Sequence, residues 1–536
     1  MDIEILLAII TIIFEIIMLN FEFRRDLMMF QQNSYRPERY MRWLRQSGDT
    51  TSGRRLCGIF VALFCMSGFG VPRFALICAT LFSIYVGAAL ARKKYKKPLV
   101  MTARAKRLLT VDFLVTLIIA GLVMSASFAG LLGKRPMPWY AIAVTLLVVY
   151  CISHIIMLIS AFLLRPVEEG INRKFYNRAK ETLESMPDLK IIGITGSYGK
   201  TSTKHYLHRI LSEQMETLMT PGSYNTTLGV VRTVNEKLKP YHQAFIVEMG
   251  AKQNGDIKEI CDLVHPLTGI ITAVGPQHLE TFKTIENVRD TKFELADALP
   301  RDGHAILNND YEIIANRNVA NCNAIRYSCG ENEADYIATE IEVVPEGTRF
   351  KLKSPDGRLL AFETRLLGKY NIANLSAAII VALLMGLDEE KIRYSVSRIE
   401  PVEHRLSLKR LPSGVTILDD AFNSNPAGAS MAVEVLSAMK TGRRIIITPG
   451  MIELGDRQFE LNRKLGRQIA ESGIDYAVVV GQYNKDAIAE GLEESGMNRE
   501  HILYFNTFLE ANAWMVAFAQ SGDVVLIEND LPDTFK

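Results

Sequence analysis

The sequence predicts a helical transmembrane module followed by an α/β region of two domains. Three observations lead to this prediction. Long apolar runs are confined to residues 1–165. From Leu189 onward, short apolar strands alternate with amphipathic helical stretches, the pattern of parallel sheets covered on both faces. A glycine-rich loop, G-S-Y-G-K-T-S, follows the first of these strands and opens a helix.

Composition excludes several classes of protein. The chain has 536 residues, enough for about three domains at roughly 100–200 residues each. Lys and Arg number 61 and Asp and Glu 59, so the net charge of +2 argues against a nucleic-acid binder. A hydrophobic content of 48% excludes a disordered chain. The seven cysteines form no C-x-x-C pair, which favours reduced thiols in a reducing compartment.

Five apolar runs make up the first module: Ile3–Asn20, Leu56–Val71, Phe74–Ala91, Leu108–Leu132 and Trp139–Leu164. A helix needs about 20 apolar residues to cross a bilayer, and the first, fourth and fifth runs are long enough. The second and third runs are short and closely spaced, which favours a hairpin or a re-entrant pair. The first run lacks a basic segment before it and a cleavage site after it, so we expect an anchor rather than a signal peptide.

Charge placement predicts the orientation of this module. Residues 21–55 and 92–107 are rich in Arg and Lys, whereas the alternate loops carry only Arg73 and then Lys134 with Arg135. Basic loops stay cytoplasmic. Five crossings, or three with a re-entrant hairpin, both place the amino terminus outside and the chain after residue 165 in the cytoplasm. We therefore expect a multi-pass protein of the cytoplasmic (inner) membrane with membrane lipid as a partner.

The pattern predicts four segments: a transmembrane module at 1–165, a connecting helix at 166–188, and α/β domains at 189–400 and 401–536. A drop in helical pattern near Arg405 marks the last boundary. The expected strands are Lys190–Thr195, Ala244–Met249, Gly269–Val274, Ala305–Asn308, Thr416–Asp419, Arg444–Thr448, Tyr476–Gly481, His501–Phe505 and Asp523–Ile527. The expected helices include Lys200–Ser212 and Ile372–Met385.

The glycine-rich loop predicts a nucleotide phosphate site. Its backbone N–H groups, at a helix amino terminus, suit phosphate oxygens. Lys200 would reach the β and γ phosphates, and the Thr201 hydroxyl would bind Mg²⁺. The general P-loop has another glycine where Ile194 stands. Glu248 ends an apolar strand, where an acid beside a P-loop can bind Mg²⁺, although an acid at a strand end is more often simply solvated.

Nine motifs in order carry a resemblance to a family. They are G-S-Y-G-K-T-S, V-E-M-G-A, G-P-Q-H-L-E, T-K-F-E-L, L-N-N-D, G-K-Y-N-I-A-N-L-S-A-A, E-H-R-L, D-D-A-F-N-S-N-P and G-M-I-E-L-G. Over about residues 189–530 the chain resembles the Mur ligases, most closely the D-alanyl-D-alanine-adding (MurF-type) branch. That family uses the short G-x-x-G-K-T loop. The resemblance implies a P-loop central domain and a Rossmann-like C-terminal domain.

The resemblance also implies a reaction. ATP phosphorylates a carboxylate to an acyl phosphate, an amine attacks, and ADP and phosphate are released. The partners would be a cell-envelope peptide precursor, possibly lipid-linked, and an amino acid or dipeptide amine, with D-alanyl-D-alanine favoured. The cofactors would be ATP and Mg²⁺, and no nucleic acid is expected.

Site residues follow from the same resemblance. The catalytic set would be Lys200, Glu248, His278 and Lys292, and the metal ligands would be Thr201, Glu248, His278 and Lys292. Lys292 would be carbamylated; the alternative is a surface lysine paired with Glu294 or Asp290. The ATP contacts would be Gly196, Ser197, Gly199, Lys200, Thr201, Ser202, Asn308, Asp310, Asn371, Asn374, Arg405 and Asp420.

The chain departs from the family pattern at three places. Asn462 stands where the branch commonly has His, and Glu528-Asn529 replaces a K-G-S/H ending, so the identity of the amine is open. The family's amino-terminal domain, which holds a UDP-sugar, has no counterpart before residue 189. We therefore predict a membrane-associated acceptor, with a lipid-linked and a UDP-linked precursor both open.

Other classes of protein remain as alternatives. A polyglutamate-type amide synthetase is the main alternative within the enzymes. A non-catalytic membrane P-loop scaffold is disfavoured because Lys200, Glu248, His278 and Lys292 are all present. An ATP-driven transporter is disfavoured because the chain has neither a conventional Walker A loop nor an ABC-type signature.

Overall fold

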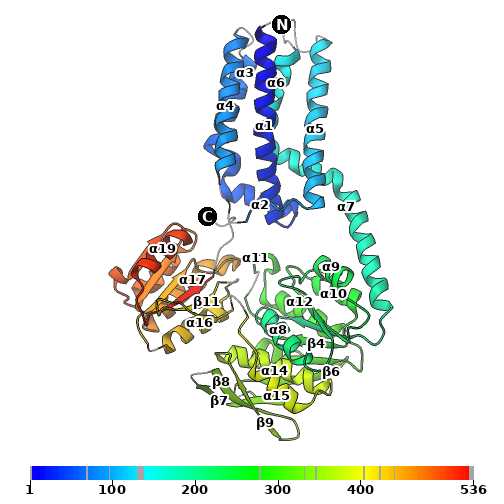
Figure 1. Cartoon of the computed structure of the whole chain (residues 1–536), viewed down its shortest axis with the longest axis vertical. Helices are drawn as coiled ribbons and strands as arrows, with labels where there is room; N and C mark the ends of the chain where they lie inside the picture. The colour runs from blue at the N-terminus through cyan, green and yellow to red at the C-terminus, as the bar shows by residue number, and fades with distance from the viewer. Residues whose placement is uncertain are drawn as a thin grey trace. The chain divides into compact units, whose positions relative to one another are not determined.

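The computed structural model describes residues 3–67, 71–93, 95, 97–129, 138–276, 279–330, 332–344, 347–402, 405–421, 424–439 and 441–529. These residues fall into two compact units, one within 3–172 and one within 173–529. The first unit consists of helices in its described part, and the second contains all the strands (Figure 1). This agrees with the predicted fold class.

The helices of the first unit match the apolar runs only in part. They are α1 (Ile3–Gln32), α2 (Pro37–Ser47), η1 (Asp49–Thr51), α3 (Gly53–Ser67), α4 (Pro72–Arg92), α5 (Ala103–Phe128), α6 (Pro138–Cys151) and α7 (Ser153–Glu184). Helix α7 begins in the first unit and ends in the second. The expected connecting helix is therefore the later part of a longer helix, with Pro166 inside it.

Three described helices, α1, α4 and α5, are long and apolar enough to cross a membrane. Helices α6 and α7 qualify only as a pair, because the chain bends by 81° between them. Two expectations are therefore wrong: the third apolar run is long enough alone, as α4, and the fifth is broken. Helix α3 has 15 residues, short of the about 20 that a span needs. The described residues thus offer three candidate spans, or up to four, rather than five.

A network of buried charges lies inside the first unit. Arg55 of α3 forms ion pairs with Glu22 at 2.9 Å, with Asp26 at 3.2 Å and with Asp49 at 3.4 Å. Arg25 of α1 also pairs with Glu22 and Asp49. Glu22, Asp26 and Arg55 are fully buried. Buried charges are tolerated when each has partners of opposite charge, and this network provides them.

Arg55 also binds the chain at the bend between α6 and α7. Its Nη1 donates to the carbonyl oxygens of Tyr150 and Cys151, each at 3.3 Å, and to the Ser153 hydroxyl at 3.1 Å. The last carbonyls of a helix lack intrahelical donors, and the guanidinium supplies them. Arg25 and Arg55 belong to the basic segment 21–55 that was expected to be a cytoplasmic loop, but the structure buries both of them in ion pairs.

The central domain of the second unit is built on a nine-stranded sheet with the order β2-β3-β1-β4-β5-β6-β7-β8-β9. Its strands are β1 (Lys190–Thr195), β2 (Thr217–Met219), β3 (Ala244–Glu248), β4 (Thr268–Ile271), β5 (His304–Asn308), β6 (Asn323–Ser328), β7 (Tyr336–Val344), β8 (Gly347–Lys353) and β9 (Leu359–Thr364). Strands β1 to β6 pair in parallel, and β7, β8 and β9 form an antiparallel extension. The alternation of strands and helices in the sequence did not predict these three antiparallel strands.

Helices cover both faces of this sheet. They are α8 (Lys200–Leu211), α9 (Thr227–Lys237), α10 (Asp256–Val264), α11 (Leu279–Phe282), α12 (Ile285–Asp297), α13 (Glu312–Ala315), α14 (Lys369–Leu384) and α15 (Glu389–Ser397). Helices α8, α14 and α15 enclose one apolar core. Helices α9, α10 and α12, with the end of α7, enclose the other. Because β1 and β3 are parallel neighbours, their carboxyl ends meet at one edge of the sheet, where Gly196 and Glu248 lie.

The C-terminal domain has a six-stranded sheet with the order β10-β11-β15-β12-β13-β14. Its strands are β10 (Ser407–Arg410), β11 (Thr416–Asp420), β12 (Arg444–Thr448), β13 (Tyr476–Val480), β14 (Ile502–Phe505) and β15 (Val524–Glu528). Its longer helices are α16 (Pro426–Ala438), α17 (Gln458–Glu471), α18 (Lys485–Glu494) and α19 (Phe508–Phe518). Only β10 is antiparallel, so the sheet is Rossmann-like, as expected.

Candidate active site

The phosphate loop joins β1 to α8 and fits only with glycine at two positions. A Cβ on Gly196 would lie 2.1 Å from the Thr272 hydroxyl, and one on Gly199 would lie 2.2 Å from Oδ1 of Asn374. Gly199 also has a φ of +79°, which other residues rarely adopt. The loop therefore packs directly on the end of β4 and on α14. Gly199, the N-cap of α8, has no side chain to cap the first N–H groups of the helix, an arrangement that suits an anion.

Lys200 begins α8 and folds back over the loop. Its Nζ donates to the carbonyl oxygen of Gly196 at 2.5 Å and to that of Ser197 at 3.3 Å. Burial lowers the pKa of Lys200 to about 8, although the Glu248 carboxylate opposes this shift. The ammonium is thus held by weak neutral acceptors, which a phosphate could replace with a much stronger, charged partner.

Glu248 and Thr201 meet beside the loop. The Thr201 hydroxyl donates to Oε2 of Glu248 at 3.1 Å, and Glu248 is 1% exposed. A hydroxyl and a carboxylate are hard oxygen donors of the type that Mg²⁺ prefers, so these residues fit that ion. Within the described chain, no group of three His, Cys, Asp or Glu side chains gathers for a metal. A metal here would therefore also need phosphate or water oxygens.

Two further residues hold Glu248, and the sequence reading missed both. The Lys204 ammonium lies 3.0 Å from Oε2, and Nδ2 of Asn225 donates to Oε1 at 3.0 Å. Burial would raise the pKa of Glu248, but Lys204 and then Lys200 outweigh it and lower that pKa. Lys204 could have been noticed, because residues three apart on a helix share a face and Lys204 follows Thr201 by three.

Lys292 lies on α12 and is 2% exposed. Burial, and after it the nearby Lys200 charge, lower its pKa to about 7, against the opposing effects of Glu294 and Asp256. The alternative of a surface lysine is therefore wrong. Glu294 instead accepts bonds from the backbone N–H groups of Gly255 and Lys258. His278 lies outside the described residues.

A hollow of ≈80 Å³ gathers most of the predicted ATP contacts. Its lining includes Gly199, Ser202, Asn308, Asn371, Asn374, Arg405 and Asp420, together with Tyr198, Tyr311 and Tyr370. The enclosed space is smaller than the roughly 300 Å³ or more of pockets that bury a ligand. These residues must therefore move apart to admit a nucleoside.

Arg405 and Asp420 belong to the C-terminal domain and line this hollow. Burial lowers the pKa of Arg405 and raises that of Asp420 to about 6, while the charge of each residue opposes the shift of the other. Asp420 also accepts from the backbone N–H of Leu406 at 3.0 Å. This hydrogen bond orients the Asp420 carboxylate.

Asn308, Asn371 and Asp310 already have roles in the fold. Nδ2 of Asn308 donates to the Thr272 carbonyl at 2.9 Å, and Oδ1 of Asn371 accepts from Tyr206 at 2.9 Å. Asp310 accepts from the Cys329 N–H through Oδ2, while its buried Oδ1 has no partner among the described residues. Of these three, Asp310 has the acceptor still available for a ligand.

The two departures at the C-terminal end are structural in this fold. Asn462 is fully buried and accepts from the Met451 N–H at 2.8 Å. Glu528 is fully buried and accepts from Thr448 at 2.5 Å and from Ser424. Burial raises the pKa of Glu528 to about 7. Ser424 lines the hollow, so Glu528 fixes one of its walls.

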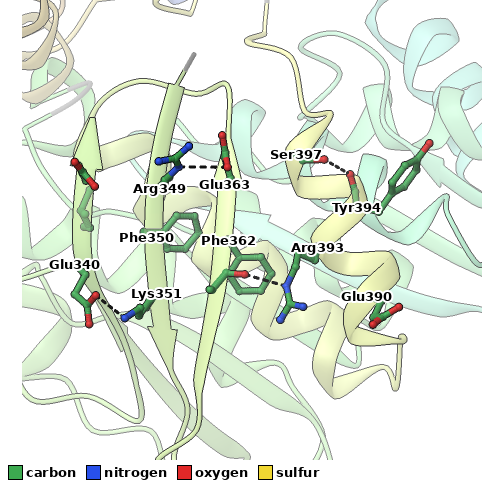
Figure 2. A pocket seen from close by; sticks show the side chains of 13 residues that line it. Glu340, Arg349, Phe350, Lys351, Phe362, Glu363, Glu390, Arg393, Tyr394 and Ser397 are labelled. Carbon is green, nitrogen blue, oxygen red and sulfur yellow. Dashed lines mark hydrogen bonds and ion pairs between the residues drawn. The ribbon is translucent and has the colours of Figure 1, made fainter. Parts of the chain in front are cut away.

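A second hollow, of ≈930 Å³, lies where α15 meets β8 and the edge strand β9 (Figure 2). Charged side chains of both signs line it and pair across the strands, as Arg349 does with Glu363 and Lys351 with Glu340. Arg393 of α15 donates to the Ala361 carbonyl and so covers the strand edge. Edge strands are commonly protected in this way, and none of the predicted site residues line this groove.

Comparison with known proteins agrees with this geometry. The Mur ligase middle domain family matches residues 194–382, and the Mur ligase glutamate ligase domain family matches residues 404–528. Two relatives named UDP-N-acetylmuramoyl-tripeptide–D-alanyl-D-alanine ligase are similar. The one from Escherichia coli is 32% identical over 313 residues, which cover 57% of this chain and 68% of the relative. The one from Bacillus subtilis is 27% identical over 340 residues, covering 63% and 72%.

Solved structures give the same result. MurF from Acinetobacter baumannii superposes with a TM-score of 0.60 and 29% identity, over 67% of this chain and 77% of that chain. MurF from Thermotoga maritima in complex with ADP superposes with a TM-score of 0.60, over 67% and 80%; at 22% identity it supports the fold alone. The chain belongs to the Mur ligase family, and it is an ATP-dependent ligase that forms a C–N bond.

Proposed function

We propose that this ligase adds D-alanyl-D-alanine to the carboxylate of a cell-envelope peptide precursor at the cytoplasmic face of a membrane. The observation that carries the proposal is the grouping of Lys200, Thr201, Glu248 and Lys292 around one phosphate loop. The relatives named above support the choice of amine. The roles of individual residues below are part of this proposal.

The proposed chemistry has two steps. A carboxylate oxygen of the acceptor attacks the γ-phosphorus of ATP. The bond to the β–γ bridging oxygen breaks, ADP departs, and the acceptor becomes an acyl phosphate. The amine nitrogen then attacks the acyl carbon, loses a proton, and phosphate departs with the C–O electron pair. Positioning and charge stabilisation dominate such transfers.

The chain's own residues supply those effects. Lys200 would leave the loop carbonyls and neutralise charge on the β and γ phosphates. Thr201 and Glu248 would hold Mg²⁺, which when bound stabilises charge on the phosphates. Arg405 would approach the γ-phosphate from the C-terminal domain, and Asp420 would accept from the ribose hydroxyls.

Lys292 is expected to be carbamylated. Carbamylation requires a neutral amine, and a pKa of about 7 keeps a large neutral fraction at neutral pH, whereas an ordinary lysine near 10.4 is almost wholly protonated. Lys292→Ala should lose most ligase activity, and added short-chain carboxylates should partly restore it. With ¹³C-bicarbonate, the wild type should give a carbamate signal in ¹³C spectra that Lys292→Ala lacks. A wild-type spectrum without this signal would contradict the prediction.

We further propose that the first unit is a multi-pass membrane anchor that leaves the ligase domains in the cytoplasm. Helices α1, α4 and α5 support this by length and apolar composition. The basic residues of 92–107 support the sidedness. Such an anchor raises the local concentration of an acceptor carried by a lipid, and basic segments attract its anionic head group. We therefore favour a lipid-linked acceptor over a soluble UDP-linked one.

The test uses purified full-length protein with ATP, D-alanyl-D-alanine and either a UDP-linked or a lipid-linked muramyl tripeptide. Phosphate release and product mass are measured for both acceptors. We expect ligation of D-alanyl-D-alanine, with the lipid-linked acceptor preferred. A truncated chain beginning at Glu169 serves as the comparison. Equal activity of both chains on the UDP-linked acceptor would contradict the lipid-linked proposal, and no ligation of the dipeptide to either acceptor would contradict the choice of amine.

A further inference from the structure

Lys204 is a buried cation next to the proposed metal ligands. It is fully buried, and its ammonium lies 3.0 Å from Oε2 of Glu248. The same ammonium donates to the carbonyl oxygen of Gly222 at 2.6 Å. These two partners come from the end of β3 and from the loop before α9, so Lys204 is fixed from two sides. Because two partners fix Lys204, its ammonium can in turn restrain the position of the Glu248 carboxylate.

The Glu248 carboxylate is restrained at both oxygens. Oε2 accepts from Thr201 at 3.1 Å and from Lys204, and Oε1 accepts from Asn225 at 3.0 Å. The loop that carries Asn225 is itself fixed, because the Gly250 N–H donates to the Asn225 carbonyl at 2.7 Å. Rotation of the carboxylate would break contacts with Lys204 and Asn225 together.

This restraint bears on which cation the site accepts. Thr201 can turn its proton away and offer an oxygen lone pair, which frees one position on Oε2. Lys204 and Asn225 do not need to move for that change. A carboxylate held in this way can bind a cation through one oxygen but cannot turn both oxygens toward it. One-oxygen ligation suits Mg²⁺, which is small and octahedral and keeps several waters, whereas Ca²⁺ commonly takes both oxygens of a carboxylate.

We propose that Lys204, assisted by Asn225, is a positioning residue that keeps Glu248 a one-oxygen ligand and thereby favours Mg²⁺ over Ca²⁺. The proposal rests on the proposed function of this site as a nucleotide–metal site. It concerns a residue outside the predicted catalytic set. Neither Lys204 nor Asn225 needs to touch the reacting atoms for this role.

The test measures metal binding rather than turnover. The full-length protein in detergent is titrated with ADP at a series of MgCl₂ or CaCl₂ concentrations, and calorimetry gives the affinity for each cation. Lys204→Met keeps the side-chain length and removes the ammonium. We expect the ratio of Mg²⁺ to Ca²⁺ affinity to fall by about tenfold, the lower end of the effect of losing a group that orients a metal ligand.

A matched control removes a charge elsewhere on the same helix. Arg209 lies on α8, is partly exposed and pairs with Glu213. Arg209→Gln should leave the ratio unchanged. If Lys204 acted only by repelling cations, its loss would strengthen both cations alike and leave the ratio at its wild-type value. An unchanged ratio would therefore overturn the proposal.

Asn225→Ala provides a second variant for the case that Lys204→Met does not fold. Loss of the Lys204 ammonium leaves the buried Glu248 charge without its ion-pair partner, which destabilises the fold. Asn225→Ala frees Oε1 alone and should also lower the Mg²⁺ to Ca²⁺ ratio, by raising Ca²⁺ affinity. If it does not, the proposal fails even when Lys204→Met does not fold. These titrations contain neither amine nor acceptor, so they do not depend on the proposed substrates. Failure of the wild type to bind ADP with either cation would instead contradict the proposed nucleotide site.

Discussion

Lys200→Met is expected to lower kcat for ATP-dependent ligation by about 10²–10³-fold, the usual effect of removing one group that stabilises transition-state charge. The reason lies in the loop itself. Among the described residues, the ammonium of Lys200 hydrogen-bonds to neutral carbonyls, at Gly196 and Ser197. Its charge is therefore available for the phosphates, and the other cations nearby, such as Lys204 on Glu248, already have partners.

The same change should not destabilise the protein. Burial already disfavours the Lys200 charge, and its repulsion from Lys292 and Arg405 opposes its attraction to Glu248, so we expect its removal to change stability little. Phosphate release is measured at saturating ATP, and thermal unfolding is followed in parallel. Lys190→Met, at the exposed start of β1, the strand that leads into the loop, is the control and should keep wild-type activity. Turnover of Lys200→Met within threefold of the wild type would refute the proposed role.

Arg55→Met is expected to lower the free energy of unfolding of the first unit by about 3–5 kcal/mol, the range for breaking a buried ion pair by removing one partner. Three carboxylates, of Glu22, Asp26 and Asp49, depend on this guanidinium. Arg25 would remain, but it also pairs with Glu22 and Asp49. The carbonyls of Tyr150 and Cys151 would lose a donor at the bend between α6 and α7.

The measurement is thermal unfolding of the full-length protein in detergent, together with protease sensitivity near residues 150–153. Arg45→Met is the matched control, because Arg45 is an exposed arginine in the last turn of α2. Its loss should change the unfolding temperature little. Wild-type stability of Arg55→Met would show that the buried network does not hold this unit together.

Much of the fold was predictable from local sequence. Strand β1 has the predicted bounds, and β3, β11 and β13 differ from prediction by one residue at one end. These strands were predictable because a short apolar run between polar turns indicates a buried strand. The phosphate loop was predictable from its contiguous motif, and Glu248 from its place at the end of an apolar strand and in the V-E-M-G-A motif. The extension of β7, β8 and β9 was not predicted, since its strands alternate buried and exposed residues and carry charged side chains, so they form no continuous apolar run.

The sequence by itself determined the order of the elements, the phosphate loop and the family, because these depend on periodicity and on contiguous motifs. The tertiary structure decided which distant charges meet. Only folding places Lys204 and Asn225 on Glu248, and Arg55 on three carboxylates and at the end of α6. It also decided that Lys292 is buried and that the fifth apolar run bends. Burial and pairing depend on contacts between segments far apart in the chain, which local sequence patterns do not encode.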